Sequence, residues 1–353
     1  MTKTFVVRLS RCSFDVRRTP HDERRTSRLF CSILIMLAIA APVLAQSARL
    51  EQVGVVPGAA EIVRLQGTQA YAALGRTLTV FDVANPAAPR KVGAHTFPDK
   101  IWGVTEAGGL VYAAVDKYGL AILDASGPGG LALRGSFKTP GQAKSVALVG
   151  TTALVADHMS GVDFINVSNP AKPASLGSFF LEGYARAVAA AGSIAAAVDA
   201  PTGLYLFDFT RAATLEAVGT EQSADRPMLV DVTSTNGSSV PNVAVLVGSG
   251  TLQIYDISAP AAPRKLSTFR TPAGRPARVT LRNSLAYVAD LVDGLVIVDL
   301  ADPASPRMAG TFKTPMPARD VAVGDGLVLV AVARGGSSEV PPSEGHIIVL
   351  REK

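Results

Sequence analysis

Short apolar runs recur along the chain, each closed by a carboxylate or an amide and followed by a polar, proline-containing segment. In the clearest copy the run LVIVD ends at Asp299, and apolar residues resume at Met308 after LADPASPR. The runs end at Asp82, Asp124, Asn166, Asp208, Asp256 and Asp299. Successive ends lie 42, 42, 42, 48 and 43 residues apart. A nearly fixed period of this length predicts an array of structural repeats.

The composition of each repeat favours strands. Aliphatic and β-branched runs alternate with Gly, Pro, Asn and Asp, as in antiparallel sheets. The third repeat divides into strands at 143–149, 152–157, 161–167 and 174–181, with turn residues between them. Four sequential strands in about 42 residues have the size of one propeller blade. The sequence therefore predicts an all-β propeller of four-stranded antiparallel blades.

The ends of the repeat region predict how the ring closes. Six complete blades occupy 61–97, 101–138, 143–181, 185–221, 227–270 and 276–313. The seventh, at 318–350, has only three strands, whereas residues 50–57 (LEQVGVVP) resemble a last strand such as LRGSFKTP. Pairing this N-terminal strand with the last blade would close a ring of seven blades and leave no exposed sheet edge. A six-bladed ring with unpaired terminal pieces is the alternative.

The LVIVD motif resembles the one that gives the LVIVD-repeat family its name. Leu295 to Asp299 match that name letter for letter, and related copies extend over nearly all of the chain after residue 46. The resemblance implies an exported, propeller-like repeat protein. It implies no particular activity, because the activities of family members are mostly undefined.

The first 45 residues have the pattern of a signal peptide. Arg24, Arg25 and Arg28 precede a mostly apolar segment, 29–44, and small residues lead to a cleavage position after Ala45. About 16 residues is short of the roughly 20 that a membrane-spanning helix needs. We therefore expect an exported bacterial protein, periplasmic or extracellular, with no transmembrane anchor after processing. Residues 46–353 would form a single seven-bladed domain.

Removing this segment changes the charge and the cysteine content. It contains eight of the 34 Lys and Arg and three of the 29 Asp and Glu, which leaves 26 of each sign. A balanced chain supplies no long-range field for nucleic acid, so we expect no nucleic-acid partner. Cys12 and Cys31 are removed as well. The domain would then be held together by packing, without disulfides.

The repeated turn residues favour a structural role. Side chains of the kind found at Asp82, Asp124, Asn166, Asp208, Asp256 and Asp299 accept backbone N–H groups in the turn that follows. With one copy per blade they lie too far apart to share a ligand. We therefore expect them to be structural turn residues.

Basic residues begin or precede most innermost strands, on the face where successive blades are connected, called here the mouth face. They are Lys100, Lys144, Arg186, Arg226, Arg278 and Arg319, whereas blade one has Glu61. A second carboxylate series, on the same face, comprises Asp116, Asp157, Asp199 and Asp290. The favoured interpretation is that each base pairs with a neighbouring carboxylate. The alternative is a basic collar that binds an anionic ligand such as an acidic glycan, a carboxylate or a phosphate.

The remaining candidates for chemistry are few. Trp102, the only tryptophan, is favoured as a core residue, with stacking on a sugar ring as the alternative. His158 and His346 come from blades that are not neighbours, so we expect no metal site and no cofactor. Nucleophile, metalloprotease and phosphate-loop motifs are absent from the sequence. Two insertions, 234–242 opposite the mouth and 334–345 on the mouth face, are candidate functional loops.

Two classes of function remain open. The favoured one is a non-enzymatic, monomeric binding scaffold whose mouth face takes a partner protein or a surface glycan, most simply an anionic one. The alternative is a hydrolase or lyase in the channel mouth, similar to propeller lactonases, which would require inward carboxylates from several blades. Convergence of Glu61, Asp320, His158 and Arg319 would favour the enzyme, and their separation would favour the scaffold.

Overall fold

The computed structural model describes residues 50–127, 130–210, 215–223, 225–234, 242–324, 326–336 and 340–353. The predicted signal peptide, and residues 235–241 of the insertion in blade five, lie outside these described residues. No helix in the described part is long and apolar enough to cross a membrane.

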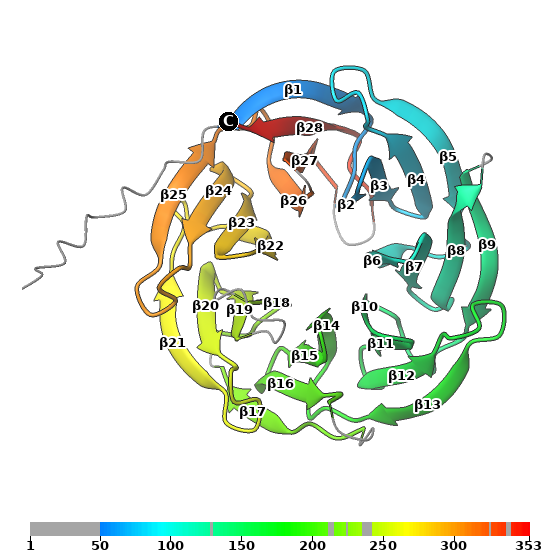
Figure 1. Cartoon of the computed structure of the whole chain (residues 1–353), viewed down its shortest axis with the longest axis vertical. Coiled ribbons are helices and arrows are strands. Elements are labelled where there is room, and N and C mark those ends of the chain that lie inside the picture. The colour runs from blue at the N-terminus through cyan, green and yellow to red at the C-terminus, as the bar shows by residue number, and fades with distance from the viewer. Residues whose placement is uncertain are drawn as a thin grey trace, which may run out of the picture. The chain divides into compact units, whose positions relative to one another are not determined.

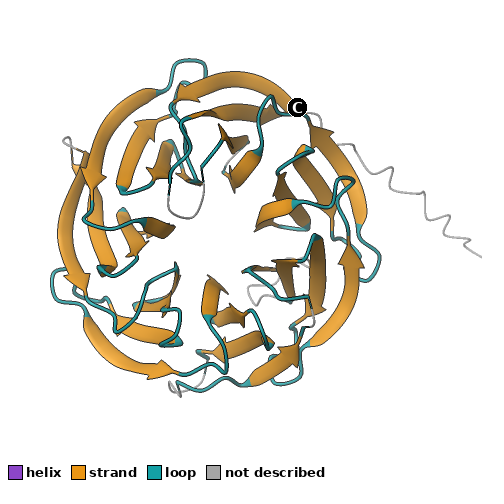
Figure 2. Ribbon diagram, turned by 180° about the vertical axis from the view of Figure 1, so that it is seen from behind, coloured by secondary structure: helices purple, strands orange, loops and turns teal. Residues whose placement is uncertain are grey.

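Seven four-stranded antiparallel sheets form a seven-bladed β-propeller, which confirms the predicted fold. Figures 1 and 2 show the sheets standing around one centre, with the first strand of each blade innermost. Blade one contains β2 (Ile62–Gln66), β3 (Gln69–Leu74), β4 (Thr77–Asp82) and β5 (Arg90–Thr96). Blade two contains β6 (Ile101–Ala107), β7 (Leu110–Val115), β8 (Gly119–Gly127) and β9 (Gly130–Phe137). Blade three contains β10 (Ser145–Val149), β11 (Thr152–Ala156), β12 (Val162–Asn166) and β13 (Ala174–Phe179).

The other four blades follow the same order. Blade four contains β14 (Ala185–Ala191), β15 (Ile194–Asp199), β16 (Gly203–Asp208) and β17 (Gly219–Gln222). Blade five contains β18 (Leu229–Thr233), β19 (Val243–Gly248), β20 (Thr251–Asp256) and β21 (Arg264–Phe269). Blade six contains β22 (Pro276–Arg282), β23 (Leu285–Asp290), β24 (Gly294–Asp299) and β25 (Arg307–Phe312). Blade seven contains β26 (Ala318–Val323), β27 (Leu327–Arg334), β28 (Glu344–Glu352) and, from the other end of the chain, β1 (Leu50–Pro57).

The strand β1 closes the ring, as the sequence predicts. It pairs with β28 in antiparallel register, from Leu50 opposite Glu352 to Pro57 opposite His346, and lies along β28 in Figure 1. Val56 is fully buried and packs in a cluster with Val63 of blade one and Val349 of blade seven. Because β1 covers the edge of β28, the six-bladed alternative with unpaired ends is wrong.

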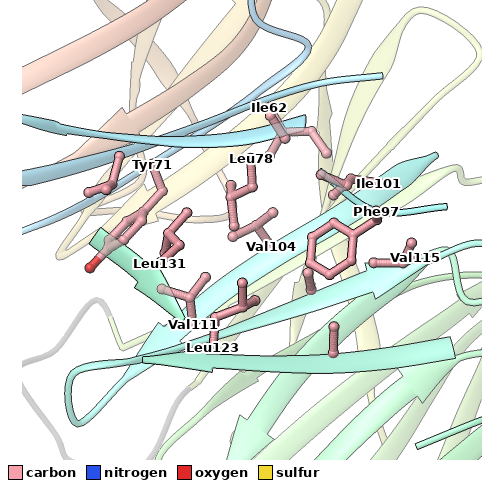
Figure 3. Packing of buried hydrophobic residues seen from close by; sticks show 14 of the residues in the cluster. Ile62, Tyr71, Leu78, Phe97, Ile101, Val104, Val111, Val115, Leu123 and Leu131 are labelled. Carbon is pink, nitrogen blue, oxygen red and sulfur yellow. The ribbon is translucent and has the colours of Figure 1, made fainter. Parts of the chain in front are cut away.

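The core lies between neighbouring blades, not within any one of them. Seven clusters of buried apolar residues are found in the described part, one at each junction between blades. At the first junction Ile62 and Leu78 pack with Val104 and Val111 of blade two (Figure 3). Since both faces of each blade are covered, the second and third strands are mostly apolar, and the LVIVD run of β24 is apolar up to its final aspartate.

A glycine is the first residue of β24, the third strand of blade six, for a steric reason. Gly294 has φ 86°, and a Cβ added to it would lie 2.6 Å from the carbonyl oxygen of Phe312 on the neighbouring strand. Both observations exclude a side chain. The recurring glycine is therefore part of the blade's construction and carries no sign of a ligand.

Candidate binding site at the channel mouth

The repeated turn residues make the same local bond in each of blades one to six. Each accepts the backbone N–H of the residue two positions later, at 2.7–3.0 Å; the donors are Ala84, Ser126, Ser168, Thr210, Ser258 and Ala301. The N–H of Ala84, followed by the Arg90 guanidinium, lowers the pKa of Asp82. These carboxylates are used within their own turns, on the face opposite the mouth.

Most of the second carboxylate series fastens the connections between blades. Asp157 accepts the hydroxyl of Thr139 at 2.7 Å, and Asp199 accepts the N–H of Gly183 at 2.9 Å. Asp290 accepts the hydroxyl of Thr271 at 2.6 Å. All three aspartates are buried. The favoured interpretation, that each collar base pairs with a neighbouring carboxylate, is wrong for these three aspartates. Neutral donors satisfy their carboxylates without a second charge being buried.

Two of the predicted collar residues do form ion pairs. Lys100 Nζ lies 3.1 Å from Glu61, and Lys144 Nζ lies 3.1 Å from Asp116. Both ammonium groups also lie over the Trp102 ring, 4.5 and 4.3 Å from its centroid. Alternating ion pairs and cation–π contacts therefore link blades one to three across the mouth.

This arrangement decides the role of Trp102. The indole is half-buried at the wall of the mouth and belongs to none of the core clusters, so the favoured core position is wrong. Its Nε1 is buried without a hydrogen-bond partner among the described residues. Since two ammonium groups already lie over the ring, the indole positions Lys100 and Lys144 and is a poor platform for a sugar.

The collar is asymmetric, because the arginines on the other side of the mouth are not neutralised. Arg186, Arg226 and Arg278 form no ion pair with any residue in the described ranges. Arg226 is exposed, whereas Arg186 and Arg278 are half-buried. Arg319 differs from both groups, because its guanidinium donates to the carbonyl oxygen of Gly335 at 2.7 Å. The available cations are thus concentrated on blades four to six.

A cavity of about 430 Å³ lies between the two halves of the collar, and is called here the mouth pocket. Its wall includes Trp102, Lys144, His158, Arg186, Met228 and Arg278. The Nε of Arg186 is buried without a partner in the described part of the chain. His158 stacks on Tyr184, with ring centroids 4.7 Å apart and an angle of 11° between the rings. Burial, and then Lys144 and Arg186, lower the pKa of His158, which favours the neutral imidazole.

Below the mouth pocket a second cavity of about 410 Å³ follows the innermost strands, and is called here the channel cavity. Arg64, Glu106, Asp231 and Arg278 line it. Arg64 pairs with Asp320 at 2.9 Å and donates to the carbonyl oxygen of Val104 at 2.9 Å. Side chains thus satisfy the free backbone edges of the innermost strands.

The carboxyl groups of this cavity are shifted by burial. Burial raises the pKa of Glu106 to about 7, partly offset by Arg64. Burial raises the pKa of Asp231 to about 6, although its carboxylate accepts the N–H groups of Leu281 and Val232 at 2.8 and 2.9 Å. Neither Glu106 nor Asp231 belongs to the site residues that the sequence pattern predicts. The sequence does contain a signal for them, because each is an acidic residue within an innermost strand. At the corresponding positions the innermost strands of blades three and four have alanine or an aliphatic residue.

The four residues whose convergence would favour an enzyme have separate partners. Glu61 pairs with Lys100, and Asp320 pairs with Arg64. His158 stacks on Tyr184, and Arg319 donates to the carbonyl oxygens of Ala333 in β27 and Gly335 just after it. No group of three or more metal-binding side chains occurs among the described residues. The structure therefore does not bring these four residues together into one reactive centre.

The insertion in blade seven lies on the mouth face. It connects β27 to β28, and a Cβ added to Gly75 in blade one would lie 3.5 Å from Cγ of Pro341. The described part of the loop therefore contacts the neighbouring blade at the seam where the ring closes.

Comparison with known proteins identifies the repeat family and supports the fold. The LVIVD repeat model matches residues 57–96, 100–139, 140–180 and 273–314. No curated protein matches the chain significantly. The computationally designed Ika8 protein aligns with a TM-score of 0.58 and 9% identity, over 82% of this chain and 83% of that one. Raptor from Chaetomium thermophilum aligns with a TM-score of 0.68 and 13% identity, over 88% of this chain and 29% of that one.

At these identities the two structures share only the fold with this chain. The repeat matches are more specific, because they fall on blades one, two, three and six, and the last of them includes the LVIVD run of β24. The chain belongs to the LVIVD-repeat family.

Proposed function

We propose that this protein is an exported, non-enzymatic binding scaffold whose mouth pocket captures an acidic glycan. One observation carries the proposal: Arg186 and Arg278 line a cavity of about 430 Å³, and neither forms an ion pair with any described residue. A half-buried guanidinium without a counter-charge is costly. A ligand carboxylate would accept two parallel N–H bonds from such a group and remove that cost.

An aromatic ring beside the pocket favours a sugar over a simple anion. Tyr184 is 45% exposed, and its ring stacks on His158, which lines the pocket. The Arg186 guanidinium lies 5.9 Å from the centroid of the same ring, so a sugar in contact with the exposed part of Tyr184 would bring a uronic carboxylate close to the guanidinium. Lys144 lines the opposite wall of the pocket, where its ammonium group is paired with Asp116.

The test uses a charged and a neutral oligosaccharide of equal length. We expect hexagalacturonate to bind in isothermal titration calorimetry and maltohexaose to bind at least about tenfold more weakly. Affinity should fall between about 50 and 500 mM NaCl, because salt screens the carboxylate–guanidinium attraction.

Matched variants locate the binding. Arg186→Gln should weaken hexagalacturonate at least about tenfold, through loss of the bidentate contact. Arg307→Gln on β25, an exposed arginine of the outermost strand, should leave the affinity unchanged. Equal affinity for both oligosaccharides, or an equal effect of the two substitutions, would refute the proposal.

The second candidate function is binding of a partner protein. Apolar side chains on the mouth-face connections of blades three to five favour it. Met159 is 73% exposed, Phe180 75% and Met228 46%. Apolar groups gathered on one face are typical of docking surfaces. Capture of a protein from envelope extract that is lost in Met159→Ser/Phe180→Ser and kept in Arg186→Gln would support this candidate over the glycan.

A further inference from the structure

The channel cavity continues the mouth pocket toward the centre of the ring. Ser145, Leu229 and Arg278 line both cavities, so they mark the level at which the two meet. Glu106 and Asp231 line only the channel cavity and lie deeper along their strands. The channel cavity is therefore reached through the mouth and has charged groups at two levels.

The upper level carries a cation without a partner. The Arg278 side chain makes no hydrogen bond or ion pair with any residue that the structure describes. Two carboxylates act on Arg278 only at longer range, because each is already bound elsewhere. Asp320 is bound by Arg64 at 2.9 Å and by the N–H of Val63 at 3.0 Å, and Glu61 is bound by Lys100 at 3.1 Å. The guanidinium at the junction is thus left to face the cavity.

The lower level carries two carboxyl groups that form no ion pair with a described residue, although the Arg64 charge acts on both at longer range. The Oε2 atom of Glu106 is buried and has no hydrogen-bond partner within the described ranges. Asp231 accepts only backbone N–H groups, from Leu281 and Val232, and forms no ion pair with a described residue. Neither carboxylate lies within ion-pair distance of Arg278. Unsatisfied charges of both signs therefore face one cavity at separate levels.

We infer that the channel cavity binds a small zwitterion, with its ammonium group between Glu106 and Asp231 and its carboxylate on Arg278. Isolated charges in a cavity are costly to desolvate, and a ligand with a single charge would leave the opposite sign uncompensated. A zwitterion supplies both counter-charges. A volume of about 410 Å³ lies within the usual range for small-molecule sites.

The ligand class follows from the polarity of the cavity. The ammonium end enters first, because the carboxyl groups lie deeper, and the carboxylate stops at the junction with the mouth pocket. An amine and a carboxylate separated by a short chain, as in an amino acid, meet this requirement. The site does not depend on glycan binding and shares only Arg278 with that proposal among the charged groups.

The test measures binding of the purified protein to glycine, 4-aminobutanoate and 6-aminohexanoate by calorimetry. The increasing length of these probes reports the spacing between the two levels. We expect at least one of them to bind at least about tenfold more tightly than both hexanoate and hexylammonium. No heat from any zwitterion at about 10 mM, or equal binding by a probe with one charge, would overturn the inference.

Substitutions separate this site from the mouth. Glu106→Gln/Asp231→Asn and, separately, Arg278→Gln should each weaken the best zwitterion at least about tenfold, whereas Arg186→Gln should change it less than about twofold. The thermal midpoint of each variant without ligand shows whether it is folded. Undiminished binding by folded channel variants would overturn the inference, and hexagalacturonate binding by Glu106→Gln/Asp231→Asn would show that the mouth site stands independently.

Discussion

Replacing Glu106 by glutamine should stabilise the protein at alkaline pH. Glu106 is half-buried near the end of β6, and its Oε2 atom has no partner among the described residues. Burial raises its pKa from 4.5 to about 7, the Arg64 charge opposing this. Between these two pKa values the folded state keeps a proton on Glu106 that the unfolded chain has released. The free energy of unfolding therefore falls as the pH rises from 4.5 through about 7.

The magnitude follows from the pKa difference. At about 1.36 kcal/mol per pH unit, the ionised carboxylate lowers the free energy of unfolding by about 3 kcal/mol at pH 8. At pH 4.5 the folded state is neutral, and the same calculation gives less than about 0.5 kcal/mol. Because glutamine has the same shape and no charge, Glu106→Gln should gain about 3 kcal/mol at pH 8 and almost nothing at pH 4.5.

The assay is thermal unfolding of the wild type and the variant at both pH values. A gain of this size should raise the midpoint by roughly 5 °C at pH 8 for a domain of this length. Glu344→Gln, at an exposed position at the start of β28, is the matched control and should shift neither midpoint. A Glu106→Gln midpoint at or below that of the wild type at pH 8 would show that water in the channel solvates the carboxylate. Burial would then not destabilise the ionised Glu106 side chain.

Two further predictions concern the ring and its connections. A chain beginning at Gly58 lacks β1, which leaves the edge of β28 unpaired and exposes cluster residues such as Ile347 and Val349. At roughly 1.5–3 kcal/mol for each such side chain, we expect loss of the folded monomer in size-exclusion chromatography, and a monomer with an unchanged midpoint would contradict this. Asp290→Ala should cost about 3 kcal/mol or more in denaturant unfolding, because Thr271, Arg275, Val292 and Asp293 all lose an acceptor. Asp299→Ala, which removes the acceptor of Ala301 at an exposed turn, should cost about 1 kcal/mol, and equal costs would argue against the role of burial.

The turn residues and the channel mouth differ in how much the sequence could predict. The bond from Asp299 to the N–H of Ala301 spans two residues, so the local pattern is sufficient to predict it. The partner of Lys144 is Asp116, 28 residues earlier, and it was foreseen only as one of several carboxylates on the same face. Trp102 was assigned to the core because of its residue type, whereas two lysines from adjacent blades determine its surroundings.

The sequence by itself determined the repeat, the four strands of each blade, the turn carboxylates and the closure by residues 50–57. These features depend on alternation, turn chemistry and period, which are local along the chain. Only the tertiary structure decided which collar cations are neutralised and which face the mouth pocket. It alone showed that Glu106, Asp231 and Arg278 line one channel cavity. The physical reason is that these contacts join different blades, and their distances depend on how the ring packs.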